Sequence, residues 1–250
     1  MSALILALVA GAVVGLALGA LGGGGGVLAV PALIYLLGFT PAAATTASLL
    51  IVTATSVTAL YARARAGHVR WKAGAAFAAA GAIPAALAGL LAARLPQTVL
   101  TAAFAAIAAL AALKMLRPTP ARADGPAQAV RPLRAGGAGA GLGAVTGLLG
   151  VGGGFLAVPV LVTVLAFEMQ AAVGTSLLVI TVNSLASLVT RSGSAAGLDW
   201  AVIAPFTGAA ILGAWDGKRL AEKVSGRGLQ RLFAAMLLAV AGFMLADALT

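Results

Sequence analysis

The chain has 250 residues, of which 62% are apolar and only 9% are charged, and its mean hydropathy is +1.09. This composition excludes a soluble domain, which needs a charged exterior, and indicates an integral membrane protein. The net charge of +10 does not indicate nucleic-acid binding, because Lys and Arg in membrane proteins usually mark the cytoplasmic loops. With no cysteine and one histidine, His68, the chain lacks the usual parts of a catalytic or metal site. We therefore expect no enzyme, no metal and no cofactor.

Ten apolar segments follow one another along the chain, several of them close to the twenty residues that a helix needs to cross about 30 Å of hydrocarbon. Because lipid offers no hydrogen-bond partners to a free backbone, these segments predict an all-α, polytopic membrane protein. In chain order, the segments are Ala3–Leu21, Val27–Leu37, Ala42–Ala62, Trp71–Ala93, Thr98–Leu116, Gly136–Leu149, Phe155–Phe167, Ala171–Thr190, Trp200–Trp215 and Leu229–Ala248.

Residues 117–134 separate the fifth segment from the sixth. This stretch is rich in Pro, Ala and Arg and has neither an apolar face nor a helical period, which is typical of a flexible connector. We therefore predict a first transmembrane repeat at 1–116, a cytoplasmic linker at 117–134 and a second transmembrane repeat at 135–250.

The two halves are copies of one another. Gly15–Leu33 and Gly143–Leu161, offset by 128 residues, share twelve identities in nineteen positions, and the same offset pairs Arg63 with Arg191. Further equivalent pairs are Ser48 and Ser176, Thr53 and Thr181, Ser56 and Ser184 and, at an offset of 129, Trp71 and Trp200. Similar composition alone does not hold a fixed offset across polar residues, so the halves predict a structural repeat.

Loop charges indicate that the two copies face in opposite directions. Residues 63–72 carry four cations, whereas the equivalent residues 191–199 carry one cation and one acid. The next pair of loops reverses this, with one cation in 94–97 and four in 216–228. With both termini outside, fourteen of the sixteen Lys and Arg lie in the cytoplasm. The sequence therefore predicts two inverted repeats, each with a Gly/Pro-broken or short helix and three full transmembrane helices.

Each half contains a glycine run followed by a short segment with a proline, which we expect in the first turn or so. Glycine permits a sharp break, and a proline near a helix start gives up an N–H that has no partner. Each half thus predicts a discontinuous helix whose free N–H groups and positive dipole end offer a place for an anion. The alternative is that glycine only lets helices pack closely. The candidate substrate-binding residues of these motifs are Gly24, Gly25, Gly26, Pro31, Gly152, Gly153, Gly154 and Pro159.

The stretches GGGGGVLAVPAL and GLLGVGGGFLAVPVL resemble the paired signature of the sulfite exporter TauE/SafE family of anion permeases. The resemblance extends over nearly the whole chain, including the small polar helix after each motif and the region Gly197–Trp200. It implies export of sulfite or of an organosulfonate such as sulfoacetate. The chain departs from the pattern in an extra glycine, Gly23, and in a short linker without helical pattern.

Small polar residues lie within the helix that follows each motif. Hydroxyls and amides donate hydrogen bonds to an oxyanion without trapping it. The alternative is that Ser and Thr bond their own helix backbone or join helices. For Asn183 we favour a role in the substrate pathway, because a buried amide is costlier to satisfy. The candidates in these helices are Thr45, Thr46, Ser48, Thr175, Ser176 and Asn183.

Arg191 is the most informative charge of the sequence. Its equivalent, Arg63, is explained by the cytoplasmic preference of cations, whereas an outward arginine at a helix end is not. We include Arg191 as a residue that attracts or releases the anion. The alternative is ordinary contact with the outer lipid headgroups.

These features predict a secondary-type exporter of a small anion, multi-pass in the bacterial inner membrane, that works by alternating access between the two glycine breaks. Its partners are the anionic substrate and the lipid bilayer, with no nucleic acid, and the oligomeric state stays open, a homodimer included. An anion channel of the same architecture and a transporter of a non-sulfur substrate are the alternatives. An intramembrane enzyme or a structural subunit is disfavoured, because no catalytic motif is present.

Overall fold

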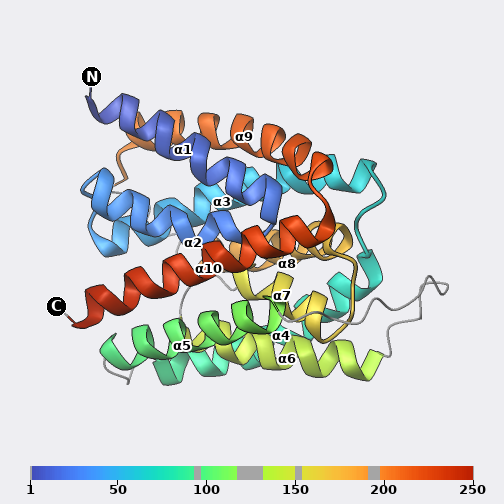
Figure 1. Ribbon diagram of the computed structural model, residues 1–250. Helices are drawn as coiled ribbons and strands as arrows, with labels where there is room; N and C mark the ends of the chain where they lie inside the picture. The colour runs from blue at the N-terminus through green and yellow to red at the C-terminus, as the bar shows by residue number, and fades with distance from the viewer. Residues whose placement is uncertain (1, 93–96, 117–131, 150–153, 191–197, 250) are drawn as a thin grey trace.

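Helices make up nearly all of the residues that the computed structural model describes, which are 2–92, 97–116, 132–149, 154–190 and 198–249 (Figure 1). The first half contains α1 (Ser2–Leu21), α2 (Gly24–Pro31), the π-helix η1 (Ala32–Leu36), α3 (Pro41–Arg65), α4 (Trp71–Ala92) and α5 (Gln97–Leu116). The second half contains α6 (Pro132–Leu149), α7 (Gly154–Thr163), α8 (Met169–Thr190), α9 (Trp200–Lys223) and α10 (Gly226–Leu249). The ten predicted segments thus appear as helices.

Several helices extend into stretches that the sequence analysis placed in loops; α6 begins at Pro132, within the predicted linker 117–134, and α10 begins at Gly226. Helix α3 continues through Arg63 to Arg65, and α9 continues eight residues beyond Trp215 to Lys223. Charged residues fit the end of α9 because opposite charges pair one helical turn apart. Arg219 lies 3.6 Å from Asp216, and Lys218 lies 3.6 Å from Glu222. The apolar pattern alone therefore underestimates the length of these helices.

The turn that precedes α3 recurs before α8. Gly38 and Ala166, which are equivalent at the offset of 128, have φ of +69° and +54°. The N–H of Phe39 donates to the Leu33 carbonyl at 3.0 Å, and the N–H of Phe167 donates to the Leu161 carbonyl at the same distance. The internal repeat of the sequence is therefore also a repeat of local backbone structure.

Each half packs one helix against the other half through glycine. Helix α1 lies along α9, and α6 lies along α4 (Figure 1). A Cβ on Gly15 of α1 would overlap the Ala210 carbonyl oxygen, and a Cβ on Gly143 of α6 would overlap the Gly81 carbonyl oxygen. These two contacts are equivalent at the offsets of 128 and 129. Small residues here let the backbones touch, as is common between transmembrane helices.

Three further contacts between the halves join equivalent helices: α3 packs against α8, α5 against α10, and α2 against α7. Two apolar clusters fill the interior. One cluster includes Leu18, Ile51, Leu177 and Phe206, and the other includes Phe77, Leu161, Val179 and Phe233. The middle of the molecule is thus shared by both halves, so a site between them draws on side chains from each.

The outer surface is apolar, which suits lipid and not water. Exposed large side chains include Ile5, Val9, Leu110 and Leu212, with exposed fractions of 59%, 58%, 59% and 69%. Among the described residues, Ala3–Leu21 and Ala43–Arg65 are helices long and apolar enough to cross a membrane, with mean hydropathies of 2.7 and 1.6. Shorter apolar helices span Ala105–Leu116 and Met169–Leu185.

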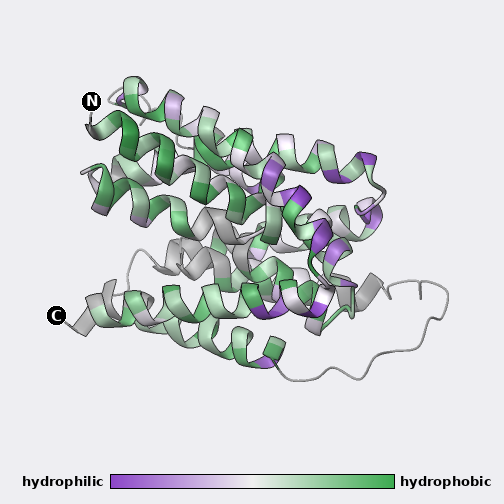
Figure 2. Cartoon of the chain, turned by 45° about the horizontal axis from the view of Figure 1, so that its top comes forward, coloured by the Kyte–Doolittle hydropathy of each residue, from purple (hydrophilic) through white to green (hydrophobic). Residues whose placement is uncertain are grey.

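Hydrophilic residues gather at one end of the bundle, opposite the two chain termini (Figure 2). The turns from α3 to α4 and from α9 to α10 lie at this end (Figure 1). The exposed cations in these turns and in the adjoining helix ends are Arg65, Arg70, Lys72, Arg219, Lys223, Arg227 and Arg231. We refer to this part of the molecule as the cationic end.

Candidate functional site

The first glycine break packs against the second half of the chain. Helix α1 ends at Leu21, Gly22 has φ of +76°, and α2 begins at Gly24. This φ favours glycine, and a Cβ on Gly22 would lie 2.6 Å from the hydroxyl oxygen of Ser176 in α8. The chain therefore turns sharply while its backbone approaches α8, which is what the glycine run predicts.

The prolines lie deeper in their helices than the sequence predicts. Because α2 begins within the glycine run, Pro31 is the eighth residue of α2, and Pro159 is the sixth residue of α7. After Pro31 the helix widens into the π-helix η1, since proline has no N–H for the regular hydrogen-bond ladder. The expected position in the first turn is thus wrong for both prolines.

The second glycine break lies outside the described residues, which omit 150–153. Gly154 is the first residue of α7, and α7 packs against α2. Convergence of the two breaks, and any contact of Gly152 or Gly153 with substrate, therefore stay predictions.

Two of the five candidate hydroxyls, those of Ser48 and Ser176, bond their own helix. Ser48 donates to the Thr45 carbonyl at 2.8 Å, and Ser176 donates to the Val173 carbonyl at 2.8 Å. The Thr175 hydroxyl is fully buried and accepts a hydrogen bond from the backbone N–H of Arg70 at 3.1 Å. Thr46 is also buried, and Thr45 is half-buried. The structure thus favours the alternative for Ser48 and Ser176, in which the hydroxyl bonds its own helix.

Ser56 and Thr181 join α3 to α8. Their hydroxyl oxygens are 3.0 Å apart, both side chains are buried, and the two helices come from different halves. Thr181 also donates to the Leu177 carbonyl at 2.8 Å. Polar residues in the predicted pathway helices therefore also hold the two halves together.

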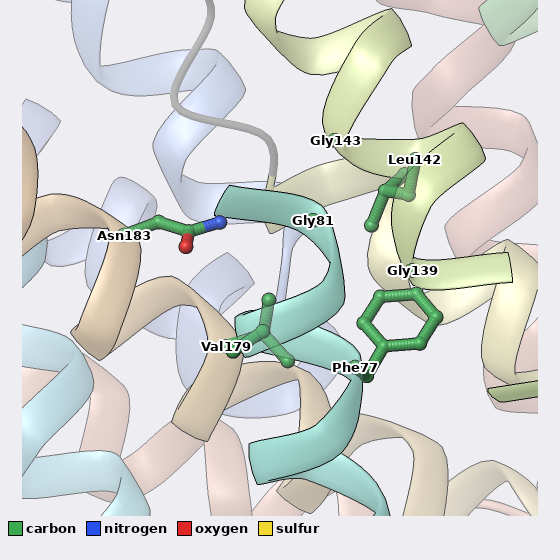
Figure 3. A pocket seen from close by; sticks show the side chains of 8 residues that line it. Phe77, Gly81, Gly139, Leu142, Gly143, Val179 and Asn183 are labelled. Carbon is green, nitrogen blue, oxygen red and sulfur yellow. The ribbon is translucent and has the colours of Figure 1, made fainter. Parts of the chain in front are cut away.

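Asn183 lies away from the first glycine break. It lines a crevice between α4, α6 and α8 of about 10 Å³, which is room for about one water molecule. Figure 3 shows its side chain pointing from α8 toward α4 near Gly81. Asn183 is seven residues beyond Ser176, or about 10 Å along the helix. It therefore does not share one compact site with Gly22 and Ser176.

Sequence reasoning missed Arg63, which it assigned to a cytoplasmic loop. The Arg63 side chain is 0% exposed and belongs to α3. Its guanidinium donates to the side-chain oxygen of Gln170 in α8 and, at 2.9 Å, to the carbonyl of Gly19 in α1. Its Nε has no hydrogen-bond partner among the described residues. The signal in the sequence was the repeat itself, which has an arginine at both 63 and 191.

Helix α9 completes the surroundings of Arg63. Gln170 donates through its amide nitrogen to the Ala221 carbonyl at 3.1 Å, and Lys218 donates to the Ala62 carbonyl at 2.9 Å. Helices α1, α3, α8 and α9 therefore meet at Arg63, in a group that we call the Arg63 junction: Gly19, Arg63, Gln170, Lys218 and Ala221. Arg191, the corresponding candidate of the second half, lies outside the described residues.

Comparison with known proteins agrees with these features. Residues 7–244 match the family described as sulfite exporter TauE/SafE. Two curated proteins of Xylella fastidiosa, from strains 9a5c and Temecula1, are 33% and 32% identical to this chain over an alignment 249 residues long, which covers 97% of this chain and 95% of each relative. Both are named "Probable membrane transporter protein". No solved structure matches the chain. The chain therefore belongs to the sulfite exporter TauE/SafE family of membrane transporters.

Proposed function

We propose that this protein exports a small anion across the bacterial inner membrane, with sulfite or an organosulfonate such as sulfoacetate as substrate. Membership of the sulfite exporter family carries the substrate class. The glycine break supports it, because α2 begins at Gly24 and directs its first N–H groups toward the break, where Gly22 meets α8. Family and relatives are named for transport and not for catalysis.

The proposed mechanism is alternating access between inverted repeats, 1–116 and 135–250, joined by a cytoplasmic linker at 117–134. The two equivalent glycine contacts, α1 with α9 and α6 with α4, support it. In Figure 1, α1 runs toward the end of the bundle from which α6 starts, as expected of oppositely oriented copies. Rocking of one unit against the other would then expose the region between the halves to each side in turn.

Transport by the full chain in proteoliposomes tests this function. We expect saturable uptake of labelled sulfite or sulfoacetate, in preference to sulfate and to anions without sulfur. A cation or a neutral solute as the preferred substrate would contradict the anion assignment. The assay is run with empty vesicles as the control, so that passive leak is subtracted.

A channel of the same architecture is the second candidate, and a counterflow experiment separates it from a carrier. Vesicles preloaded with unlabelled substrate are expected to accumulate label transiently, because a carrier exchanges substrate across the membrane. Single-channel currents without counterflow would show a pore instead.

The same purified sample, analysed by mass photometry in detergent, tests whether the protein is a homodimer.

A further inference from the structure

Arg63 is a buried cation without an acidic partner. Burying a charge costs much free energy unless an opposite charge and hydrogen bonds compensate for it. The two groups that accept from Arg63, the Gln170 amide and the Gly19 carbonyl, are neutral. Among the described residues, the ion pairs are Lys218–Glu222 and Asp216–Arg219, and neither includes Arg63.

The charges around the Arg63 junction do not cancel. Glu222 interacts electrostatically with Arg63, but it is paired with Lys218, which donates to the Ala62 carbonyl beside Arg63. Two cations and one carboxylate leave one positive charge. The Glu222 side chain is also 46% exposed, so water screens its charge. The junction thus lacks one negative charge.

The first glycine break lies next to this junction. Gly19, whose carbonyl accepts from Arg63, is one helical turn before Gly22. Gln170, the other acceptor, is six residues before Ser176, which Gly22 approaches. The buried cation and the start of α2 therefore flank the same stretch of α1 and α8.

We propose that Arg63 binds the transported anion, whose charge supplies the missing negative charge. This inference rests on the proposed function, and it assigns Arg63 as a residue that binds the transported anion. A guanidinium has five N–H donors in a planar fork that suits the oxygens of sulfite or a sulfonate, and Nε is a donor left for the ligand. The ligand class is a small oxyanion with at least two oxygens on one atom.

The internal repeat distinguishes this role from a purely structural one. At the offset of 128, Arg63 corresponds to Arg191 but Gln170 corresponds to Ala42, and at 129 Lys218 corresponds to Gly89. The backbone acceptor Gly19 has an equivalent in Gly147, but the side chains of Gln170 and Lys218 have none. If the arginine only held helices together, the side chains that it bonds should be repeated in the second half as well. The arginine is thus repeated although these two side chains are not, which supports a role for Arg63 beyond its bond to Gln170.

Two purified variants of the full chain, Arg63→Gln and Arg65→Gln, test the proposal. Arg65 is the matched control, because it lies in the same helix two residues away but is exposed and stacks on Tyr61 at 4.8 Å. We expect sulfite to raise the unfolding midpoint of the wild type and of Arg65→Gln, but not of Arg63→Gln. In proteoliposomes, Arg63→Gln is expected to raise the KM for sulfite by at least about tenfold, the effect of losing a charged hydrogen bond.

Arg63→Lys covers the case in which the neutral variant fails to fold. It keeps the charge but loses the planar fork, so we expect a raised KM with little change in the midpoint measured without anion. A wild-type KM in Arg63→Lys, or a wild-type sulfite response in Arg63→Gln, would overturn the proposal while leaving the transport function intact. If the wild type itself moves no anion, the proposed function fails, and this assignment fails with it.

Discussion

Gly143 in α6 has no room for a side chain, because a Cβ there would overlap the Gly81 carbonyl oxygen of α4. We expect Gly143→Ala to lower the free energy of unfolding by about 1–3 kcal/mol through overpacking. Gly141, in the same helix, has open space at its Cβ position, so Gly141→Ala is expected to be neutral or stabilising by up to about 1 kcal/mol. Reversible unfolding in detergent measures both. Equal losses would contradict the close packing of α4 and α6.

The repeated turns at Gly38 and Ala166 allow a test of backbone conformation that steric overlap of the side chain does not affect. A Cβ on Gly38 meets nothing within 4 Å, so only its φ of +69° penalises a substitution. We expect Gly38→Ala to cost about 1 kcal/mol and Ala166→Gly to stabilise by less, because glycine loses more entropy on folding. The same unfolding assay reports both, and changes of equal sign would mean that the two turns differ.

Single residues differ in how far the sequence reveals their role. The break at Gly22 was predictable, because few residues other than glycine adopt a φ of +76°. The burial of Arg63 was not, since Arg65 has the same chemistry two positions away and is exposed. Which of the two faces inward depends on how α3 is rotated against α8 and α9, and local composition does not determine that rotation.

Helices α3 and α8 are joined by the hydrogen bond between Ser56 and Thr181. We expect Ser56→Ala and Thr181→Val each to destabilise by about 0.6 kcal/mol, the typical worth of such a bond between membrane helices. A double-mutant cycle should recover that coupling. Thr58→Val is the control, because Thr58 donates only to the Ala54 carbonyl of its own helix, at 2.8 Å. Coupling of Thr58→Val to Thr181→Val as large as that of Ser56→Ala would contradict a direct bond.

Helix positions followed from apolar length, but helix ends and kinks did not. The charged residues in the last turns of α3 and α9 interrupt the apolar pattern, so these turns were assigned to loops. The prolines were expected near helix starts, but α2 begins within the glycine run itself. In both cases the helical hydrogen bonding extends beyond the boundary that the sequence pattern predicts: past the end of the apolar run in α3 and α9, and into the glycine run at the start of α2.

The likeness of the turns at Gly38 and Ala166 was predictable from the offset of 128, because equivalent residues recur in order along the chain. The exchange of helices between the two halves, α1 onto α9 and α6 onto α4, was not. Repetition in a sequence shows which segments are alike but not which segments touch. Of the candidate site, the sequence identified the residues near Gly22 and Ser176, while the Arg63 junction required contacts between segments more than 40 residues apart.

Thr40 and Glu168 test the inverted arrangement directly. They are equivalent at the offset of 128, both are exposed, and they precede α3 and α8. The start of α8 lies beside the end of α3, because Gln170 contacts Arg63, so the length of α3 separates the two positions by about 35 Å. Inverted repeats would thus place them on opposite sides of the membrane.

The chain has no cysteine, so Thr40→Cys and Glu168→Cys can be labelled without background. With the cationic end in the cytoplasm, we expect a membrane-impermeant maleimide to label Thr40→Cys in intact spheroplasts. Glu168→Cys should react only after the membrane is permeabilised, and the cysteine-free parent is the control. Labelling of both variants from the same side would contradict the inverted arrangement. Reversed accessibility would keep the inversion and reverse only the orientation, because the positive-inside rule alone assigns the cationic end to the cytoplasm.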